Sequence, residues 1–196
     1  MKTVKKVLIS FAMYLFFVNM AMANNYIPVI KAEDKKLYLS MENVPESTSL
    51  MILDGTGSAW IEENVTTSKR LERVFNLESL PLGAYTLIIK SSEEETLQPI
   101  KITSTGVVIE ESKRAAYFSP VFSQKRGTLK LSLQNPTNST VRVHIIDVVG
   151  RLRYQDSIQG QLAIEKDFNL KQLPAGKYNL IVNNGHKAYT RSINLR

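Results

Sequence analysis

The sequence predicts an all-β protein in which two antiparallel β-sandwiches follow a short N-terminal leader. Three observations lead to this expectation: a positively charged apolar start, an internal repeat, and apolar residues at every second position within each repeat. The composition agrees, because 43% hydrophobic and 22% charged residues in a chain of 196 are typical of globular proteins. The chain has no cysteine, so packed cores must supply the stability that disulfides give many exported domains.

The N-terminal leader has the three parts of a secretory signal peptide. Three lysines lie in the first six residues, an apolar run covers 7–20, and Ala21 and Ala23 provide the small residues of a cleavage site. The run is shorter than the roughly 20 apolar residues that a membrane span needs, and no later stretch is apolar enough. We therefore expect cleavage of residues 1–23 and export to the periplasm, the cell surface or the medium.

The rest of the chain contains one domain twice. Residues 75–89 recur as 168–182, with nine of fifteen positions identical at an offset of 93. A period this long indicates a duplicated domain rather than a solenoid. The predicted division is a first repeat at 24–103, a linker at 104–117 and a second repeat at 118–196.

Each repeat reads as β-strands throughout. Leu129, Leu131 and Leu133 alternate with polar residues, and the stretches 141–145 and 178–182 alternate in the same way. With turn residues every eight to twelve positions, each repeat offers about seven strands in under eighty residues. This pattern predicts a small immunoglobulin-like sandwich.

Two turn motifs recur in both repeats. The segments 80–85 and 173–178 share Leu-Pro-x-Gly-x-Tyr, and we expect the tyrosines to hydrogen-bond back across a corner between sheets. Asp54 and Gly57 match Asp147 and Gly150. No helix pattern or P-loop lysine follows them, so they predict hairpin turns with glycine at positive φ rather than a phosphate cradle or a catalytic loop.

Trp60 aligns with Arg153 in the repeat, and neighbouring residues on a strand face opposite sides of the sheet. We expect Leu152 and Tyr154 to face the core, which places Arg153 and Trp60 outward. An exposed tryptophan is typical of a contact surface, either a platform for sugar stacking or a seam between domains. The alternative is that Trp60 covers the edge of its own sheet.

No combination of residues predicts catalysis. His144 and His186 lack partners at ligand spacing, and the acidic run 93–95 is expected to be a solvated loop rather than a calcium site. No Gly-x-Ser-x-Gly or Ser-x-x-Lys motif occurs in a catalytic context. We therefore expect no enzyme activity, no cofactor and no metal site.

The two repeats differ in formal charge. Residues 26–102 carry 8 basic and 12 acidic groups, net −4, whereas residues 118–195 carry 11 basic and 4 acidic groups, net +7. Because the basic residues are scattered and the chain is expected to be exported, nucleic acid is excluded as a partner. The expected partners are export machinery or an envelope glycan or protein, and no membrane span is expected in the mature chain.

The second repeat resembles the C-terminal sorting domain of the bacterial type IX secretion system. In that family an aliphatic strand ends in Asp-x-x-Gly, a Leu-x-x-Leu-x-x-Gly-x-Tyr corner follows, and a basic strand closes the chain. The matching positions are Asp147, Gly150, Leu170, Leu173, Gly176 and Tyr178. The chain is also similar to small immunoglobulin-like secreted proteins of unknown function.

The resemblance implies passage across the outer membrane, followed by removal of the sorting domain or its attachment to the surface. Sorting domains normally follow a large passenger, whereas here the passenger is a diverged copy of the domain itself. Two functions therefore stay open. The first is an export or cell-surface protein directed by its second repeat, and the alternative is an adhesin-like or glycan-binding module that retains both repeats.

Overall fold

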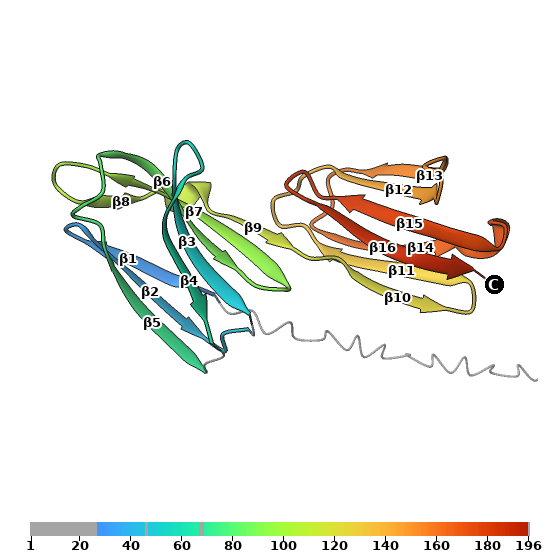
Figure 1. Cartoon of the computed structure of the whole chain (residues 1–196), viewed down its shortest axis with the longest axis horizontal. Coiled ribbons are helices and arrows are strands. Elements are labelled where there is room, and N and C mark those ends of the chain that lie inside the picture. The colour runs from blue at the N-terminus through green and yellow to red at the C-terminus, as the bar shows by residue number, and fades with distance from the viewer. Residues whose placement is uncertain (1–26, 46, 67–68, 196) are drawn as a thin grey trace, which may run out of the picture.

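Two antiparallel β-sandwiches follow one another along the long axis of the molecule in the computed structural model (Figure 1). The structure describes residues 27–45, 47–66 and 69–195. Strands dominate both halves, and the ordered helical pieces are short 3-10 turns. The predicted all-β class is therefore confirmed. The predicted cleavage residues Ala21 and Ala23 lie outside the described residues.

The first sandwich packs a three-stranded sheet, β1-β2-β5, against a sheet with the order β4-β3-β6-β7-β8, in which β9 also pairs with β7. Its elements are β1 (Val29–Glu33), β2 (Lys36–Glu42), β3 (Thr48–Asp54), β4 (Ala59–Val65), β5 (Arg70–Asn76), β6 (Gly83–Lys90), β7 (Glu94–Ile102), β8 (Val107–Ile109), the 3-10 turn η1 (Glu111–Lys113) and β9 (Ala115–Phe118).

The second sandwich packs the sheet β10-β11-β14 against the sheet β13-β12-β15-β16. Its elements are β10 (Val121–Lys125), β11 (Thr128–Gln134), β12 (Val141–Asp147), β13 (Leu152–Ile158), β14 (Ala163–Asn169), the 3-10 turn η2 (Leu170–Gln172), β15 (Gly176–Asn183) and β16 (Ala188–Leu195). Strands β10 to β16 pair in the same order as β1 to β7. Each sandwich thus contains the seven strands that the alternation predicts.

Each sandwich has its own core between its two sheets. The predicted alternation holds at Leu129, Leu131 and Leu133, which are at most 4% exposed. The stretches 141–145 and 178–182 alternate in the same way, with Val141, Val143, Ile145, Tyr178, Leu180 and Val182 buried. Because these residues come from both sheets, the apolar area that stabilises each fold is removed from water in the middle of its own sandwich.

The stretch expected to be a linker, 104–117, carries ordered structure. Strands β8 and β9 both pair with β7, so this segment extends the larger sheet of the first sandwich. Gln98 on β7 is fully buried, and its Nε2 donates to the backbone oxygen of Glu110 at 3.0 Å. Gln98 Oε1 accepts from Arg114 Nε at 2.6 Å. The first sandwich therefore continues to Phe118.

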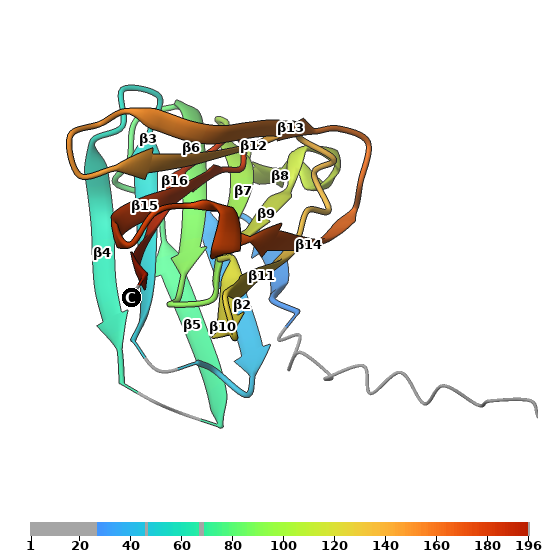
Figure 2. The same cartoon turned by 90° about the vertical axis from the view of Figure 1, so that its right-hand side faces the viewer.

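The junction between the sandwiches is a packed contact. The backbone N–H of Ser119 donates to the Glu93 oxygen at 2.7 Å, and Phe118 packs against the second core. The Tyr117 ring stacks on His186 from the β15–β16 hairpin with ring centroids 4.1 Å apart. Figure 2 looks along the long axis, with the second sandwich in front of the first. In the described ranges no helix has the length and apolar character needed to cross a membrane.

Candidate functional site

The β3–β4 hairpin turn is built around Asp54. Its Oδ1 accepts hydrogen bonds from the backbone N–H groups of Thr56 at 2.8 Å and Ser58 at 3.1 Å, and from the Thr56 hydroxyl. Gly57, at φ 85°, donates its N–H to the Asp54 backbone oxygen. The residues Asp54 and Gly57 thus form the hairpin turn that the sequence predicts, with glycine at positive φ.

A β-bulge directs Trp60 toward this turn. Ile52 pairs with Ile61 and Leu53 pairs with Ala59, so Trp60 is the extra residue on β4. A bulge re-aims the side chain of the extra residue. Trp60 Nε1 accordingly donates to Asp54 Oδ2 at 2.9 Å, while 48% of the residue stays exposed. Trp60 therefore lies outward, with one edge of its indole held in place.

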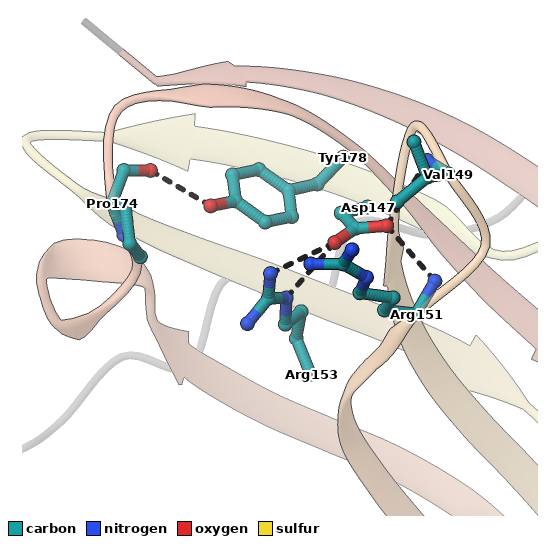
Figure 3. A network of polar contacts seen from close by, with 6 residues as sticks. All are labelled: Asp147, Val149, Arg151, Arg153, Pro174 and Tyr178. Atoms are coloured by element: carbon teal, nitrogen blue, oxygen red, sulfur yellow. Dashed lines mark hydrogen bonds and ion pairs between the residues drawn. The ribbon is translucent and has the colours of Figure 1, made fainter.

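The second sandwich repeats this arrangement with different chemistry. Ile145 pairs with Tyr154 and Ile146 with Leu152, so Arg153 is the extra residue of the equivalent bulge. Arg153 Nη2 donates to Asp147 Oδ2 at 2.8 Å, while Asp147 Oδ1 accepts from the N–H groups of Val149 and Arg151 (Figure 3). Gly150, at φ 79°, closes the turn. A guanidinium thus takes the place of the indole.

The two turn aspartates are held in their ionised form. Hydrogen bonds from the Thr56 side chain, Trp60 and the turn backbone lower the pKa of Asp54 well below its usual range. At Asp147, partial burial raises the pKa, but hydrogen bonds from the Arg151 backbone and the Arg153 side chain outweigh it, so the net shift is downward. A carboxylate whose oxygens are already bonded and whose proton affinity is low is poorly suited to act as a general base.

The sorting-like motif forms one continuous corner next to the Asp147 turn. Asp147 and Tyr178 are cross-strand partners on β12 and β15, and the Tyr178 hydroxyl donates to the Pro174 oxygen at 2.9 Å (Figure 3). Leu170 is buried, and Leu173 packs partly exposed against the same core. Gly176 begins β15 directly beside the Tyr178 ring. All six motif residues therefore serve the same end of the second sandwich.

The first sandwich has the same corner. The Tyr85 hydroxyl donates to the Pro81 oxygen at 2.9 Å, and Tyr85 pairs with Asp54 across β6 and β3. Burial, followed by the charge of Asp54, raises the pKa of Tyr85. Both tyrosines hydrogen-bond back across the corner, as the sequence predicts.

Two residues beside Arg153 are placed differently from the sequence expectation. Leu152 is 52% exposed and Tyr154 is 36% exposed, although the alternation of β13 placed both in the core. The reason is that β13 is an edge strand, where fewer neighbours cover either face. Tyr154 still makes an edge-to-face contact with Phe168 on the other sheet, with centroids 5.5 Å apart.

The acidic run 93–95 is only partly solvated. Glu93 is exposed, but Glu94 is 9% exposed and accepts from the Thr96 hydroxyl at 2.6 Å. Glu95 Oε1 lies 3.4 Å from His186 Nε2, so the run and the histidine at the opposite hairpin tip meet at the junction. No sequence signal links these two tips, because 91 positions separate them and their strands belong to different sandwiches.

His144 lies on the outer face of β12, where Arg142, Gln155 and Asp156 line the same surface hollow. Within the part of the chain that the structure describes, no group of three His, Asp or Glu side chains is arranged to hold a metal ion. The arrangement at the two hairpin turns recurs in both sandwiches, with a tryptophan in one copy and an arginine in the other.

Comparisons with known proteins give one family match and several structural similarities. The chain is similar to the BSP domain of a biofilm-associated protein at 13% identity and TM-score 0.28, covering 85% of this chain and 29% of that one. It is also similar to the FN1–FN3 domains of chicken CNTN1 at 13% identity and TM-score 0.27, covering 87% of this chain and 67% of that one. No curated protein sequence matches the chain.

The family match falls on the second sandwich. It begins in β10 and includes the Asp147 turn, the Tyr178 corner and β16. A sorting domain implies export of the chain out of the cell. Residues 125–196 match the family model of the secretion system C-terminal sorting domain, which confirms the family resemblance of the second repeat.

Proposed function

We propose that this chain is an exported, non-catalytic protein whose second repeat acts as the signal for type IX secretion. The single observation that carries the proposal is that the family match at 125–196 falls on the second sandwich, from the last residue of β10 through β16. The first repeat is then the passenger, and it is delivered to the cell surface or the medium.

The absence of catalysis is part of the proposal. The polar residues brought together at the turns are already engaged: Asp54 by Trp60 and Asp147 by Arg153. His144 and His186 lie on different elements, and His186 stacks on Tyr117. These contacts support a role in folding and surface recognition.

The test uses the two repeats as matched modules. A reporter behind a cleavable signal peptide is fused either to residues 118–196 or to residues 27–118, and both fusions are expressed in a bacterium with a working type IX system. The second module starts at Phe118 because this residue packs against the second core. We expect only the 118–196 fusion to reach the surface or the medium. Retention of that fusion in the periplasm, while an established sorting domain delivers the same reporter, would refute the proposal.

A second function is favoured by one observation, the half-exposed indole of Trp60. Its hydrogen bond to Asp54 fixes the ring at the sheet edge, and a pre-oriented aromatic ring is suited to stacking on a sugar or a protein partner. In this alternative both repeats are retained as an adhesin-like module. Trp60→Ala should then weaken binding on a glycan or envelope-protein screen, with Val74→Ala on the exposed face of β5 as the control. Equal binding by wild type and Trp60→Ala would remove Trp60 from the contact surface.

A further inference from the structure

The two sandwiches differ at the outer edge of β7 and its counterpart. Strands β1 to β7 have counterparts in β10 to β16, but within the described residues β8 and β9 have none. Both extra strands pair with β7, whose counterpart is β16. Among the described residues no strand pairs with the outer edge of β16, which ends the four-stranded sheet next to the C-terminus (Figure 1).

In the first sandwich, β8 closes the gap between the two sheets. It pairs antiparallel with β7, with Val107 opposite Ile102 and Ile109 opposite Ile100. The Val107 N–H donates at 2.8 Å to the Asp34 oxygen in the β1–β2 turn of the other sheet. Val107 and Ile109 pack against the first core. A three-residue strand thus covers the core where the sheets would otherwise part.

The second core is less covered at the equivalent place. Ile102 is 1% exposed, whereas its counterpart Leu195 is only partly buried. Ile30 on β1 is 5% exposed, whereas its counterpart Phe122 on β10 is partly buried. These differences leave apolar surface beside an unpaired strand, which is the combination that β-strand addition requires.

The backbone groups on the open edge can be assigned from the first sandwich. The Pro99 oxygen accepts from Glu110 N–H, and Thr103 N–H donates to the Gly106 oxygen, so odd-numbered residues of β7 face β8. The offset of 93 makes these the even-numbered residues of β16. Consistently, the Lys187 oxygen faces inward and accepts from Asn184 N–H. The N–H and C=O groups of Thr190, Ser192 and Asn194 therefore face outward.

We infer that the outer edge of β16 binds an extended strand of a partner protein, which completes the second sandwich as β8 completes the first. The strand pairs antiparallel with β16, places apolar side chains at alternate positions over Phe122 and Leu195, and carries carboxylates. The carboxylates follow from charge: Arg191 on β16 and Lys187 just before it are exposed, as are Lys125 at the end of β10 and Arg126 in the turn equivalent to that of Asp34. Glu110 and Glu111 follow β8 in the first repeat.

This inference does not rest on the proposed sorting role, because it follows from the comparison of the two sandwiches. The basic edge argues against pairing between two copies of β16, since an antiparallel pair would bring like charges together. Arg191 occupies the position of the buried Gln98, and its exposure reflects the missing strand.

The test uses the mature full chain and a fluorescent peptide with the sequence of residues 104–112, which contains β8 and the following glutamates. We expect saturable binding by fluorescence anisotropy, together with slowed hydrogen exchange at the amides of Thr190, Ser192 and Asn194. Asn194→Pro removes an outward N–H and should weaken binding about tenfold. Asn194→Ala keeps that N–H and should bind like wild type.

A second blocking variant guards against misfolding. Ser192→Pro places proline where the first repeat already has Pro99 in a folded strand, so its melting temperature should stay close to that of wild type. A peptide in which Glu110 and Glu111 are replaced by lysine should bind more weakly than the original peptide. Added salt should reduce the difference between the two affinities. Absence of saturable binding, equal affinity of Asn194→Pro and Asn194→Ala, protection at β7 instead of β16, or dimerisation through β16 in sedimentation would each overturn the inference.

Discussion

Trp60 and Arg153 occupy equivalent positions in the two repeats, and each donates a hydrogen bond to the aspartate that begins its own hairpin turn. Both are the extra residue of a β-bulge, so the backbone aims two chemically different side chains at the same target. Arg153 also neutralises the charge of Asp147, whereas the neutral indole leaves Asp54 negative. The shared geometry belongs to the fold, and the difference in charge belongs to the surface that each repeat presents.

The turn aspartates predict a loss of stability in acid. Because the folded-state pKa of Asp54 is depressed, its contribution is complete above its unfolded pKa of about 3.9 and is lost as the pH falls through the folded value. Asp54→Asn should lower the melting temperature of the first sandwich at neutral pH and flatten its decline below about pH 4. Glu62→Gln, an exposed change on the same β4 strand, is the control. Identical pH profiles for Asp54→Asn and wild type would contradict the role assigned to the turn.

Glu94 predicts the opposite change of stability with pH. Its burial raises the pKa, although the hydrogen bond from Thr96 opposes the shift, so ionisation of Glu94 costs stability at neutral pH. Stability should be regained as the pH falls from the raised folded pKa to the unfolded value of about 4.3. Glu94→Gln keeps an oxygen for the Thr96 hydroxyl and should raise the melting temperature at pH 7 by a few degrees. Glu93→Gln, on the exposed neighbour, should leave it unchanged, and a fall for Glu94→Gln would show that the charge is stabilising.

The two tyrosine corners predict equal effects in the two repeats. Tyr85→Phe and Tyr178→Phe each remove one hydroxyl bond to a proline carbonyl and should each cost about 1 kcal/mol of unfolding free energy. Chemical denaturation followed at probes in each sandwich measures both costs. Tyr38→Phe, on the half-buried face of β2, is the control. A much larger loss at Tyr178 than at Tyr85 would mean that the second corner carries more than this single bond.

The junction contact predicts that one aromatic stack fixes the angle between the sandwiches. His186→Ala removes the stack on Tyr117 and the contact with Glu95, while β9 stays paired with β7. Residual dipolar couplings should then show the two sandwiches aligning independently, with the couplings inside each one unchanged. His144→Ala, on the outer face of β12, should behave like wild type. A shared alignment in His186→Ala would place the rigidity in the other junction contacts, the packing of Phe118 and the hydrogen bond from Ser119 to Glu93.

The sequence predicts the cores and turns well, because these depend on local chemistry. Alternation at Leu129 to Leu133, the glycines at positive φ and the Leu-Pro-x-Gly-x-Tyr corners are all legible from neighbouring residues. Strands β8 and β9 could not be predicted from the sequence, because three and four residues are too few to show an alternating pattern. The bulges and the exposure of Leu152 depend on which strand ends a sheet, and a single sequence carries no local signal for that.

The pairing of β9 with β7 also determines how the molecule yields under tension. A pull on the second sandwich acts through Phe118, the last residue of β9, which pairs with Glu94 at the start of β7. Once the junction contacts break, the load falls on the β9–β7 pairs, and β8, which precedes β9 in the chain, is loaded next. Detaching residues 107–118 from β7 would release a segment that spans about 40 Å when fully extended. The seven remaining strands of the first sandwich would still be folded, so the segment between the repeats behaves as an extensible tether.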